Sequence, residues 1–480
     1  MAVPRNASAI VGWTIPTKSH GSKITRYRIT PYLGNVAKSA KTVRAVTHTT
    51  IAGLKNGKRY TFRVSAINAH GAGPARTSAA ITIGAPATTV STPPATTVPT
   101  TVAPTVRRPT TTTRPPTTTT RPAPAPAPTP APTPAPSPSA PCVGVAMTSG
   151  QADINAHPAG TTFCLSGTHN WALTPKTSDR LIGPAVLDGG HSTQYAVQPA
   201  TSTNVVLSGL EIRNYNPSYQ MAAIMSNQSA SGWVLQNLQV HDNGNSSGGA
   251  AVAVGPGWQI LGGRYYNNRQ KGLTDALGPN ATISGAEIDH NNFTNDAYTA
   301  ATVSCADDAG GFKWFADNVT VANSKIHDNA CVGLWMDGNA HNATLTNNQV
   351  YNNWAEGIFI EISHTANITG NSAWGNGFKS FRGSCGNIWM YGGGITINSS
   401  DNVTVANNSV TGNCNGITAT QENRSGNLLQ NIAVHDNTVS GAGKTGAAAY
   451  PVSIANLNTR NIVFANNTST GGMKMCGLGC

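Results

Sequence analysis

The sequence predicts an all-β protein whose larger part is a parallel β-helix solenoid, and three observations lead to that fold class. Segments with one pattern recur at regular spacing: GGFKWF (310–315), GLWMDG (333–338) and GIFIEI (357–362). Between them run near-copies in which apolar and polar residues alternate, VTVANSKIHDN (319–329) and ATLTNNQVYNN (343–353). Each near-copy ends in an Asn-rich turn. A period in the low twenties with such strands and turns is typical of a parallel β-helix, in which equivalent positions of successive coils lie about 4.8 Å apart.

Residues 1–86 are predicted to form a separate module of short strands. Tyr60 and Phe62 lie at alternate positions of one strand, and Asn56-Gly57 is a turn signal just ahead of it. This pattern predicts a small β-sandwich rather than a further coil of the solenoid.

Three segments of this module resemble the fibronectin type III family: SAIVGWTIP (8–16), ITRYRITPY (24–32) and HTTIAGLKNGKRYTFRVSAINAHGAGPA (48–75). The resemblance implies that Trp13 lies in the core and that Leu54 and Tyr60 form the corner that joins the two sheets. The family's first strand is absent or very short, because the chain starts almost at the strand of Trp13. No apolar signal segment is visible either. We therefore expect an N-terminal truncation that removed an edge strand and a secretion signal.

Charge is distributed unevenly along the chain. Residues 1–86 contain 13 Lys and Arg and no acid, whereas residues 142–480 contain 14 Lys and Arg against all 19 acids. The formal net charge of +12 therefore arises in the N-terminal part and gives no argument for binding nucleic acid. The basic module could bind an anionic cell-wall polymer, and a solvated basic face is the alternative.

Residues 87–141 are predicted to be a disordered linker. Threonine runs are followed by APAPAPTPAPTPAPSPSAP, and 17 of the 30 prolines of the chain lie in this segment. A segment of this composition cannot bury a core, so we expect a stiff and extended spacer.

Residues 142–480 are predicted to be the solenoid, with roughly ten or eleven coils. The pattern resembles the right-handed parallel β-helix superfamily, whose best-known members are pectate lyases and polygalacturonases. Within it, the series from Lys313 through GLWMD to GIFIEIS is similar to secreted β-helix repeat proteins that are thought to act on polysaccharide. Asparagines at the turns predict left-handed backbone and side-chain stacking, namely Asn291, Asn329, Asn353, Asn376 and Asn413.

All eight cysteines lie in the predicted solenoid: Cys142, Cys164, Cys305, Cys331, Cys385, Cys414, Cys476 and Cys480. An even number at coil-like separations predicts disulfides and an extracellular or cell-wall location. Our interpretation is sequential pairing, 142–164, 305–331, 385–414 and 476–480, among 105 possible connectivities. Reduced thiols in a cytosolic protein would fit poorly beside a Thr/Pro linker of the secreted type.

Alternation along the strands predicts which residues face outward. Leu334 and Met336 should face the core, with Trp335 and Asp337 outside. Extended over the neighbouring coils, this gives one outward column of Lys313, Asp337, Glu361, Asn398 and Thr420. A parallel column contains Gly311, Trp335, Phe359, Thr396 and Thr418.

We predict that Lys313, Asp337 and Glu361 are catalytic and that Trp335, Phe359 and Asn398 bind substrate. Aromatic rings stack on the faces of sugars, and polar groups meet their hydroxyls. The alternative is a surface salt-bridge ladder without function, worth under ~1 kcal/mol.

A lyase acting on a uronate-containing glycan is the first mechanism that fits these residues. Asp337, Glu361, Asp307 and Asp308 could hold Ca²⁺ through hard oxygen ligands. Lys313, with its pKa lowered by burial, could be the base that removes the C5 proton. The resemblance to pectate lyases implies the same residue types, although no pectate-lyase signature peptide is present.

Two further functions remain open at this stage. In a glycoside hydrolase, Asp337 and Glu361 on adjacent rungs would lie about 5 Å apart, near the spacing of retaining enzymes. The polygalacturonase series is absent apart from Asp307-Asp308. A non-catalytic glycan-binding or adhesive surface protein is the third possibility.

Four histidines, His241, His290, His327 and His435, recur at one corner of the coils and are interpreted as turn residues. No run of 18 apolar residues is present, so no membrane span is predicted. No nucleotide motif is found. The expected partner is a polysaccharide substrate and not nucleic acid, and the expected state is a monomer.

Overall fold

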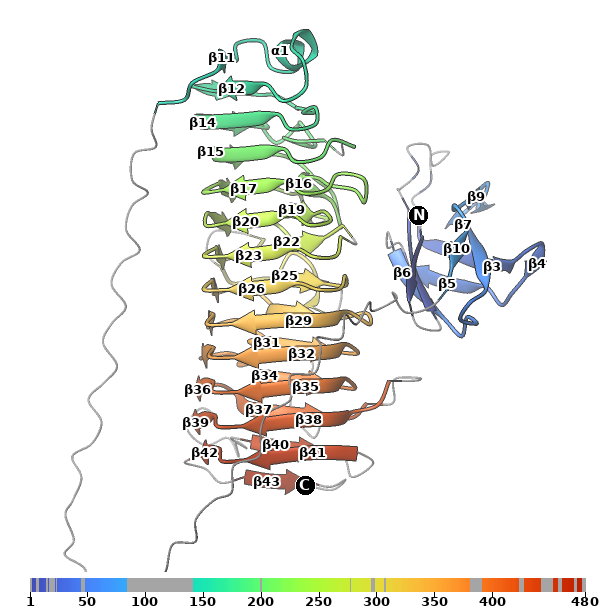
Figure 1. The fold of residues 1–480 in the computed structure, drawn as a ribbon, viewed down its shortest axis with the longest axis vertical. Helices are drawn as coiled ribbons and strands as arrows, with labels where there is room; N and C mark the ends of the chain where they lie inside the picture. Colours follow the sequence, from blue (N-terminus) through green and yellow to red (C-terminus); the bar gives the residue numbers. More distant parts are fainter. Residues whose placement is uncertain are drawn as a thin grey trace, which may run out of the picture.

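The computed structural model describes residues 2–5, 8–13, 16, 22, 24–44, 48–83, 141–198, 201–276, 278–294, 298–305, 308–379, 391–422, 427–441, 452–455, 460–469 and 473–476. Within these ranges there is one α-helix, α1 (Gln151–Ala156), and nearly all other regular structure is strand (Figure 1). The predicted fold class is confirmed: the protein is all-β, with a parallel β-helix that follows a small module of antiparallel sheets.

The N-terminal module consists of two antiparallel sheets. The smaller sheet contains β1 (Ala2–Arg5), β2 (Ser8–Gly12) and β6 (His48–Ala52). The larger sheet contains β3 (Arg26–Leu33), β4 (Val36–Ala37), β5 (Lys41–Arg44), β7 (Arg59–Asn68), β8 (Gly71–Ala72), β9 (Arg76–Thr77) and β10 (Ile81–Thr82). The first strand is present and short, as β1 pairs with β2.

The predicted corner of this module is confirmed. The Tyr60 hydroxyl accepts a hydrogen bond from the backbone N–H of Lys55 at 3.2 Å. Tyr60 and Leu54 are both buried. Trp13 packs against the same core, with its ring centroid 5.1 Å from that of Tyr27.

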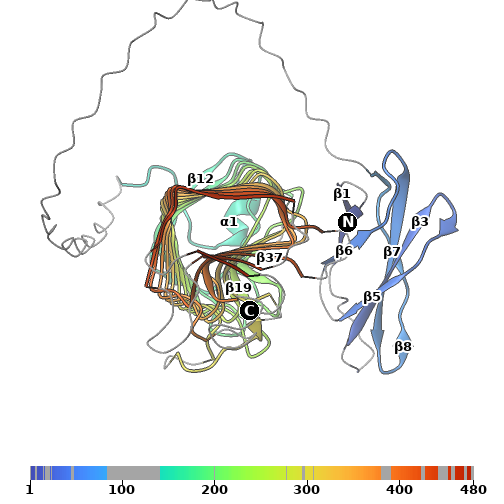
Figure 2. The same cartoon turned by 90° about the horizontal axis from the view of Figure 1, so that it is seen from below.

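The solenoid consists of coils that each contribute up to three strands, and strands of one kind stack in parallel (Figure 2). It begins with β11 (Val145–Ala146), β12 (Thr162–Cys164) and β13 (Thr168–His169). One stack contains β14 (Arg180–Asp188), β15 (Val206–Arg213), β17 (Val234–Gln236), β20 (Gln259–Leu261), β23 (Thr282–Ser284), β26 (Thr320–Ala322), β29 (His341–Thr346), β32 (His364–Thr369), β35 (Asp401–Ala406), β38 (Gln430–His435) and β41 (Arg460–Ala465).

Two further stacks complete the coils. One contains β18 (Gln239–His241), β21 (Arg264–Tyr266), β24 (Glu287–Asp289), β27 (Lys325–His327), β30 (Gln349–Tyr351), β33 (Ser372–Trp374), β36 (Ser409–Thr411), β39 (Thr438–Ser440) and β42 (Thr468–Ser469). The other, which we call the site sheet, contains β16 (Ala222–Ile224), β19 (Ala250–Val254), β22 (Lys271–Asp275), β25 (Gly310–Trp314), β28 (Val332–Met336), β31 (Ile358–Glu361), β34 (Gly393–Asn398), β37 (Asn415–Thr420), β40 (Val452–Ala455) and β43 (Met473–Cys476).

A ladder of buried asparagines joins the coils at one inner corner. Each side-chain Nδ2 donates to the Oδ1 of the next coil at 2.8–3.0 Å, through Asn243, Asn268, Asn291, Asn329, Asn353, Asn376 and Asn413. The predicted side-chain stacking is therefore confirmed. The left-handed backbone lies one residue earlier than expected, at His290, Asp328 and Asn352 among others. The ladder asparagines themselves point inward and form hydrogen bonds between coils.

The disulfides that can be followed agree with sequential pairing. Cys142 is bonded to Cys164, and Cys305 is bonded to Cys331. Cys414 is also disulfide-bonded. Its predicted partner Cys385, the side chain of Cys476, and Cys480 lie outside the described residues, so the other two pairs stay predictions.

Replacing Asn353 with Ala is expected to lower the free energy of unfolding by about 2–4 kcal/mol, because buried groups of Asn329 and Asn376 lose their partner. Chemical denaturation followed by circular dichroism measures the change. Asn367→Ala on the exposed side of β32 is the matched control, with an expected change below about 0.5 kcal/mol. Equal destabilisation by both substitutions would contradict the role of the ladder.

Candidate functional site

The predicted site lies on the outward side of the site sheet. Phe312, Leu334, Met336, Ile358 and Ile360 all belong to the buried core, as alternation predicted. The residues between them in the sequence therefore face away from the core. The predicted alternation of inward and outward residues is therefore confirmed.

The register of Lys313 differs from the prediction. β25 pairs with β28 so that Lys313 lies beside Trp335, and Trp335 lies beside Phe359. Lys313 thus begins the aromatic column, whereas Glu361 and Asn398 pair as predicted. The physical reason is coil length: Gly310 pairs with the residue 22 positions later, while the next coil advances by 24.

A column of glycines would have given the correct register. A Cβ at Gly311 would come within 2.8 Å of Asn329 Nδ2, and one at Gly333 within 2.7 Å of Asn353 Nδ2. Only glycine fits where the strand passes the asparagine ladder. Counting outward residues from that glycine places Lys313 and Trp335 in the same column.

Lys313 nevertheless reaches Asp337, because its long side chain spans the diagonal between neighbouring rungs. Its Nζ lies 2.8 Å from Asp337 Oδ2 and 2.5 Å from Asp308 Oδ1. The ammonium also lies 3.2 Å from the centroid of the Trp335 ring. The indole Nε1–H of Trp335 donates to Glu361 Oε2 at 3.1 Å. The three residues predicted to be catalytic therefore form one network, with Asp308 and Trp335 as connecting groups.

The expected direction of the Lys313 pKa is wrong. Lys313 is almost completely buried, and burial alone lowers its pKa. The nearby carboxylates Asp308, Asp337 and Glu361 together outweigh that effect and raise the pKa above its ordinary value. Lys313 is therefore a fixed positive charge rather than a neutral amine.

A second lysine, Lys271, belongs to the site and was not predicted from the sequence. It lies on the preceding rung of the site sheet and is completely buried. Its Nζ donates to Gln220 Oε1 at 2.8 Å and to Thr274 Oγ1 at 3.3 Å. Burial lowers the pKa of Lys271 to about 8, partly offset by the attraction of Asp308.

Gln220 connects the two lysines. Its side-chain Nε2 donates to Asp308 Oδ2 at 3.2 Å, while its Oε1 accepts from Lys271. Asp308 in turn holds Lys313. The sequence signal that would have found Lys271 is its place immediately before Gly272, at the same corner as Gly311.

The predicted sugar-binding aromatics are not exposed. Trp335 is 3% exposed and Phe359 is 0% exposed, and both pack with Tyr391 in a small apolar cluster. Asn398 is buried as well, and its Nδ2 donates to the Tyr391 hydroxyl at 3.3 Å. These residues are buried because Tyr391 packs against them. Tyr391 comes from a segment between two coils, which the repeat pattern does not describe.

Three of the residues proposed for Ca²⁺, Asp308, Asp337 and Glu361, do not fit that ion in this arrangement. The Lys313 ammonium binds both Asp308 and Asp337 and so occupies the position that a cation would take. Glu361 is turned to the Trp335 indole. Asp307 lies outside the described residues.

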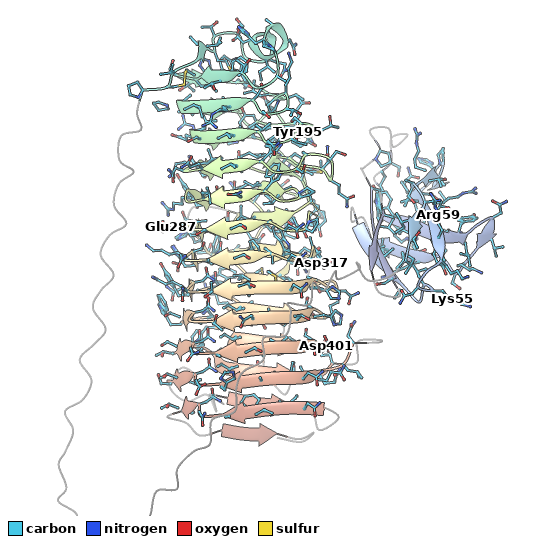
Figure 3. All side chains as sticks on the ribbon, viewed as in Figure 1. Lys55, Arg59, Tyr195, Glu287, Asp317 and Asp401 are labelled. Atoms are coloured by element: carbon cyan, nitrogen blue, oxygen red, sulfur yellow. A yellow bond between two sulfur atoms is a disulfide. The ribbon has the colours of Figure 1, made fainter. Side chains whose placement is uncertain are left out.

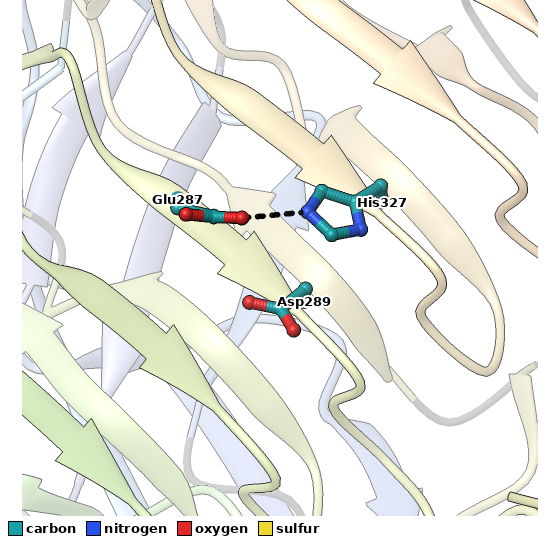
Figure 4. A group of neighbouring side chains, drawn as sticks. All are labelled: Glu287, Asp289 and His327. Carbon is teal, nitrogen blue, oxygen red and sulfur yellow. Dashed lines mark hydrogen bonds and ion pairs between the residues drawn. The ribbon is translucent and has the colours of Figure 1, made fainter. Parts of the chain in front are cut away.

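A second group of charged residues lies at the edge of another stack, where Glu287 is labelled in Figure 3. Figure 4 shows Glu287, Asp289 and His327, whose ligand-type atoms all lie within 4.8 Å of one another. Every member already has a partner: Arg264 binds both oxygens of Asp289 at 2.8 and 2.7 Å, and His327 Nε2 lies 3.1 Å from Glu287 Oε1.

This second group is an ion-pair network. Burial lowers the pKa of His327, but Asp328, Glu287 and Asp289 outweigh it and raise the pKa to about 9. His327 is therefore protonated near neutral pH and has no free lone pair for a metal. His241 and His327 occupy equivalent positions of this stack, whereas His435 ends β38 in another stack, so the prediction that the four histidines share one corner is wrong.

Comparisons with known proteins agree with this fold. Residues 222–390 match the family model of the right handed beta helix region, and residues 2–83 match that of the fibronectin type III domain. The chain therefore carries both kinds of domain. No match is found among curated proteins. No helix in the described ranges is long and apolar enough to cross a membrane.

Several solved structures are similar. The A-module of mannuronan C-5 epimerase AlgE4 from Azotobacter vinelandii is 13% identical, with 68% of this chain and 93% of that chain covered and a TM-score of 0.46. Pectate lyase Pel9A is 13% identical, with 69% and 80% covered and a TM-score of 0.30. PfbA, a surface adhesin of Streptococcus pneumoniae, is 10% identical, with 66% and 85% covered and a TM-score of 0.32.

The raised pKa of His327 predicts a pH-dependent stability. Its contribution is fully present below the unfolded pKa of about 6.5 and is lost as the pH rises through about 9. Between these limits the free energy of unfolding should fall by roughly 2–3 kcal/mol more in the native protein than in His327→Gln. Chemical denaturation across the pH range measures this difference.

His435 provides the control, because it ends β38 in another stack and its side chain is 37% exposed. His435→Gln should keep the pH dependence of the native protein. A His327→Gln profile that is indistinguishable from the native one would contradict the assignment.

Proposed function

We propose that the protein is a polysaccharide-active enzyme that removes the C5 proton of a uronate residue, most simply a lyase. The observation that supports this is the contrast between two neighbouring lysines. The pKa of Lys271 is lowered to about 8 by burial, while that of Lys313 is raised by carboxylates. Environments that push two pKa values apart are typical of paired acid and base groups in active sites.

In this proposal Lys271 is the base and Lys313 is the fixed cation. A neutral amine with a pKa near the working pH is suited to accept a proton from carbon. The Lys313 ammonium stabilises the negative charge that develops on the uronate carboxylate when C5 loses its proton. No step requires a metal ion.

A lyase would eliminate the substituent at C4 of the uronate. The C5–H electron pair forms the double bond between C4 and C5, the C4–O4 bond breaks, and Lys271 takes the proton. The leaving oxygen takes a proton from water, and the hydroxide that remains removes the proton from Lys271. For the Lys271 amine to reach the sugar, substrate must replace the contact between Gln220 and Asp308. Catalytic contacts often form only in the complex with substrate.

Asp308 and Asp337 lie where a substrate would enter. Their side chains are 21% and 14% exposed, whereas Lys313 is 2% exposed. Both carboxylates hold the ammonium in place before substrate binds. A uronate carboxylate would compete with them for Lys313.

The hydrolase alternative has less support. It requires one protonated and one free carboxyl group on either side of the bond. Asp337 is held by Lys313 and by the backbone N–H of Gly338 at 2.6 Å, and the buried Glu361 is held by Trp335. A glycan-binding protein without activity remains the outcome if no turnover is found.

We place the protein outside the cell. Its disulfides, Cys142–Cys164 and Cys305–Cys331, are typical of an oxidising compartment. Uronate polymers of the cell surface are the accessible substrates there.

Lys271→Met is expected to reduce kcat/KM on the preferred uronan by at least about 100-fold, the usual contribution of a general base. The assay incubates the protein with polygalacturonate, alginate and glucuronan. It follows ultraviolet absorbance of unsaturated ends, new reducing ends, and deuterium incorporation at C5. In the native protein, kcat/KM should rise with pH through about 8, since only the neutral amine accepts a proton.

Lys325→Met, in β27 of another sheet, is the matched control and should keep the native rate. Deuterium incorporation without cleavage would mean inversion at C5 rather than elimination. Reducing ends without unsaturated ends would instead support the hydrolase. An active Lys271→Met protein with an unchanged pH profile would overturn the role of Lys271.

Lys313→Gln tests the fixed cation separately. It should lower kcat at every pH, because it removes charge stabilisation and keeps the base. The pH at which activity rises should also move upward, because the positive charge of Lys313 lowers the pKa of Lys271. If the profile moved but the rate at high pH were native, Lys313 would be tuning the base and not stabilising the intermediate. Kinetics from pH 6 to 10 separate these results.

A further inference from the structure

The outer face of the larger sheet in the fibronectin type III module carries exposed arginines. Alternation on β3 places Tyr27 and Ile29 in the core and leaves Arg26 and Arg28 exposed. On β7, Phe62 is buried and the neighbouring Arg63 is exposed. We call Arg26, Arg28 and Arg63 the arginine face.

The strand register places hydroxyl groups between these arginines. Arg28 pairs with Thr42 of β5 on one side and with Ser65 of β7 on the other. Thr30, two residues along β3, pairs with Arg63. The surface therefore combines guanidinium groups with hydroxyls, which can donate to carboxylates and to sugar hydroxyls.

One arginine of this face is pre-oriented. The guanidinium of Arg63 lies over the Tyr32 ring, with its Cζ 4.4 Å from the centroid, and its Nη1 is 3.4 Å from the Tyr32 hydroxyl. Stacking leaves the guanidinium edge free to bind an anion. Arg63 therefore loses less side-chain freedom when an anion binds.

No carboxylate of the N-terminal part can neutralise this face. The first acidic residue of the chain is Asp153, far beyond the module. Arginines on other protein surfaces are usually interspersed with acids. Here an external polyanion is the chemical complement.

We propose that the arginine face binds an anionic polysaccharide, with uronate carboxylates held by Arg26, Arg28 and Arg63. This deepens the proposed function and rests on it for the identity of the polymer. The disulfides of the solenoid favour an extracellular polyanion over a nucleic acid. The face would hold the chain on its substrate while the solenoid acts.

Affinity electrophoresis of the full chain tests the proposal. Native gels contain polygalacturonate, alginate or neutral dextran. The triple variant Arg26→Gln/Arg28→Gln/Arg63→Gln should bind the two uronans about tenfold or more weakly than the native protein, and dextran should retard neither protein.

The matched control removes the same charge elsewhere in the module. Lys55, Lys58 and Arg59 are exposed at the start of β7, and two of them are labelled in Figure 3. Lys55→Gln/Lys58→Gln/Arg59→Gln should change the affinity less than about threefold, because only general attraction is lost. An equal loss in both triple variants would overturn the arginine face as a site.

Two further results would also overturn it. One is equal retardation by dextran. The other is binding of duplex DNA at the same affinity with the same dependence on the arginine face. The electrophoresis reports binding and not turnover. If the Lys271 experiment fails while uronan binding stays intact, only the proposed enzymatic activity is refuted. If both triple variants keep the native turnover and only the arginine variant loses binding, the division of roles is supported.

Discussion

The register of the solenoid depends on one inner corner, where buried asparagine amides hydrogen-bond from coil to coil beside a column of glycines. An unpaired amide in that dry corner would be costly, and the coils from Asn243 to Asn413 each present Asn there. Only a glycine lets the strand pass the asparagine side chain at this corner. Coils of 22 and 24 residues therefore stay in register, since the extra residues go into turns. Every outward position is fixed by its distance from that glycine.

The site follows from this constraint. Lys271 stands just before the corner glycine of its coil, and Lys313 stands two residues after the glycine of the next. Two side chains of the same type therefore lie in different environments. The Lys271 amine donates hydrogen bonds to neutral groups, Gln220 and Thr274, whereas the Lys313 ammonium is bound by carboxylates. A rigid stack of strands keeps these neighbours in place and keeps the two amines chemically different.

The sequence allowed prediction of what is local and periodic: the fold class, the inward residues such as Leu334, and the Cys142–Cys164 bond. It did not give what depends on irregular segments. Equal spacing of three charges concealed a short coil and misplaced Lys313. Tyr391, which covers the aromatic residues, and Asp308, which reverses the pKa of Lys313, both lie between coils, where no period constrains position.

The distribution of charge connects the two domains in function. All 19 acids lie in residues 142–480, where they exceed the 14 Lys and Arg, so a uronate polymer would be repelled by the solenoid at long range. The electrostatic field of a site rich in carboxylates does little to increase the rate at which a polyanion encounters it. A module with arginines and no acid supplies the opposite field on the same chain. In the proposed function, tethering would convert capture by the module into a high local concentration of polymer at the site. Attraction and chemistry would then be separated, and the solenoid could keep the acidic residues that hold Lys313.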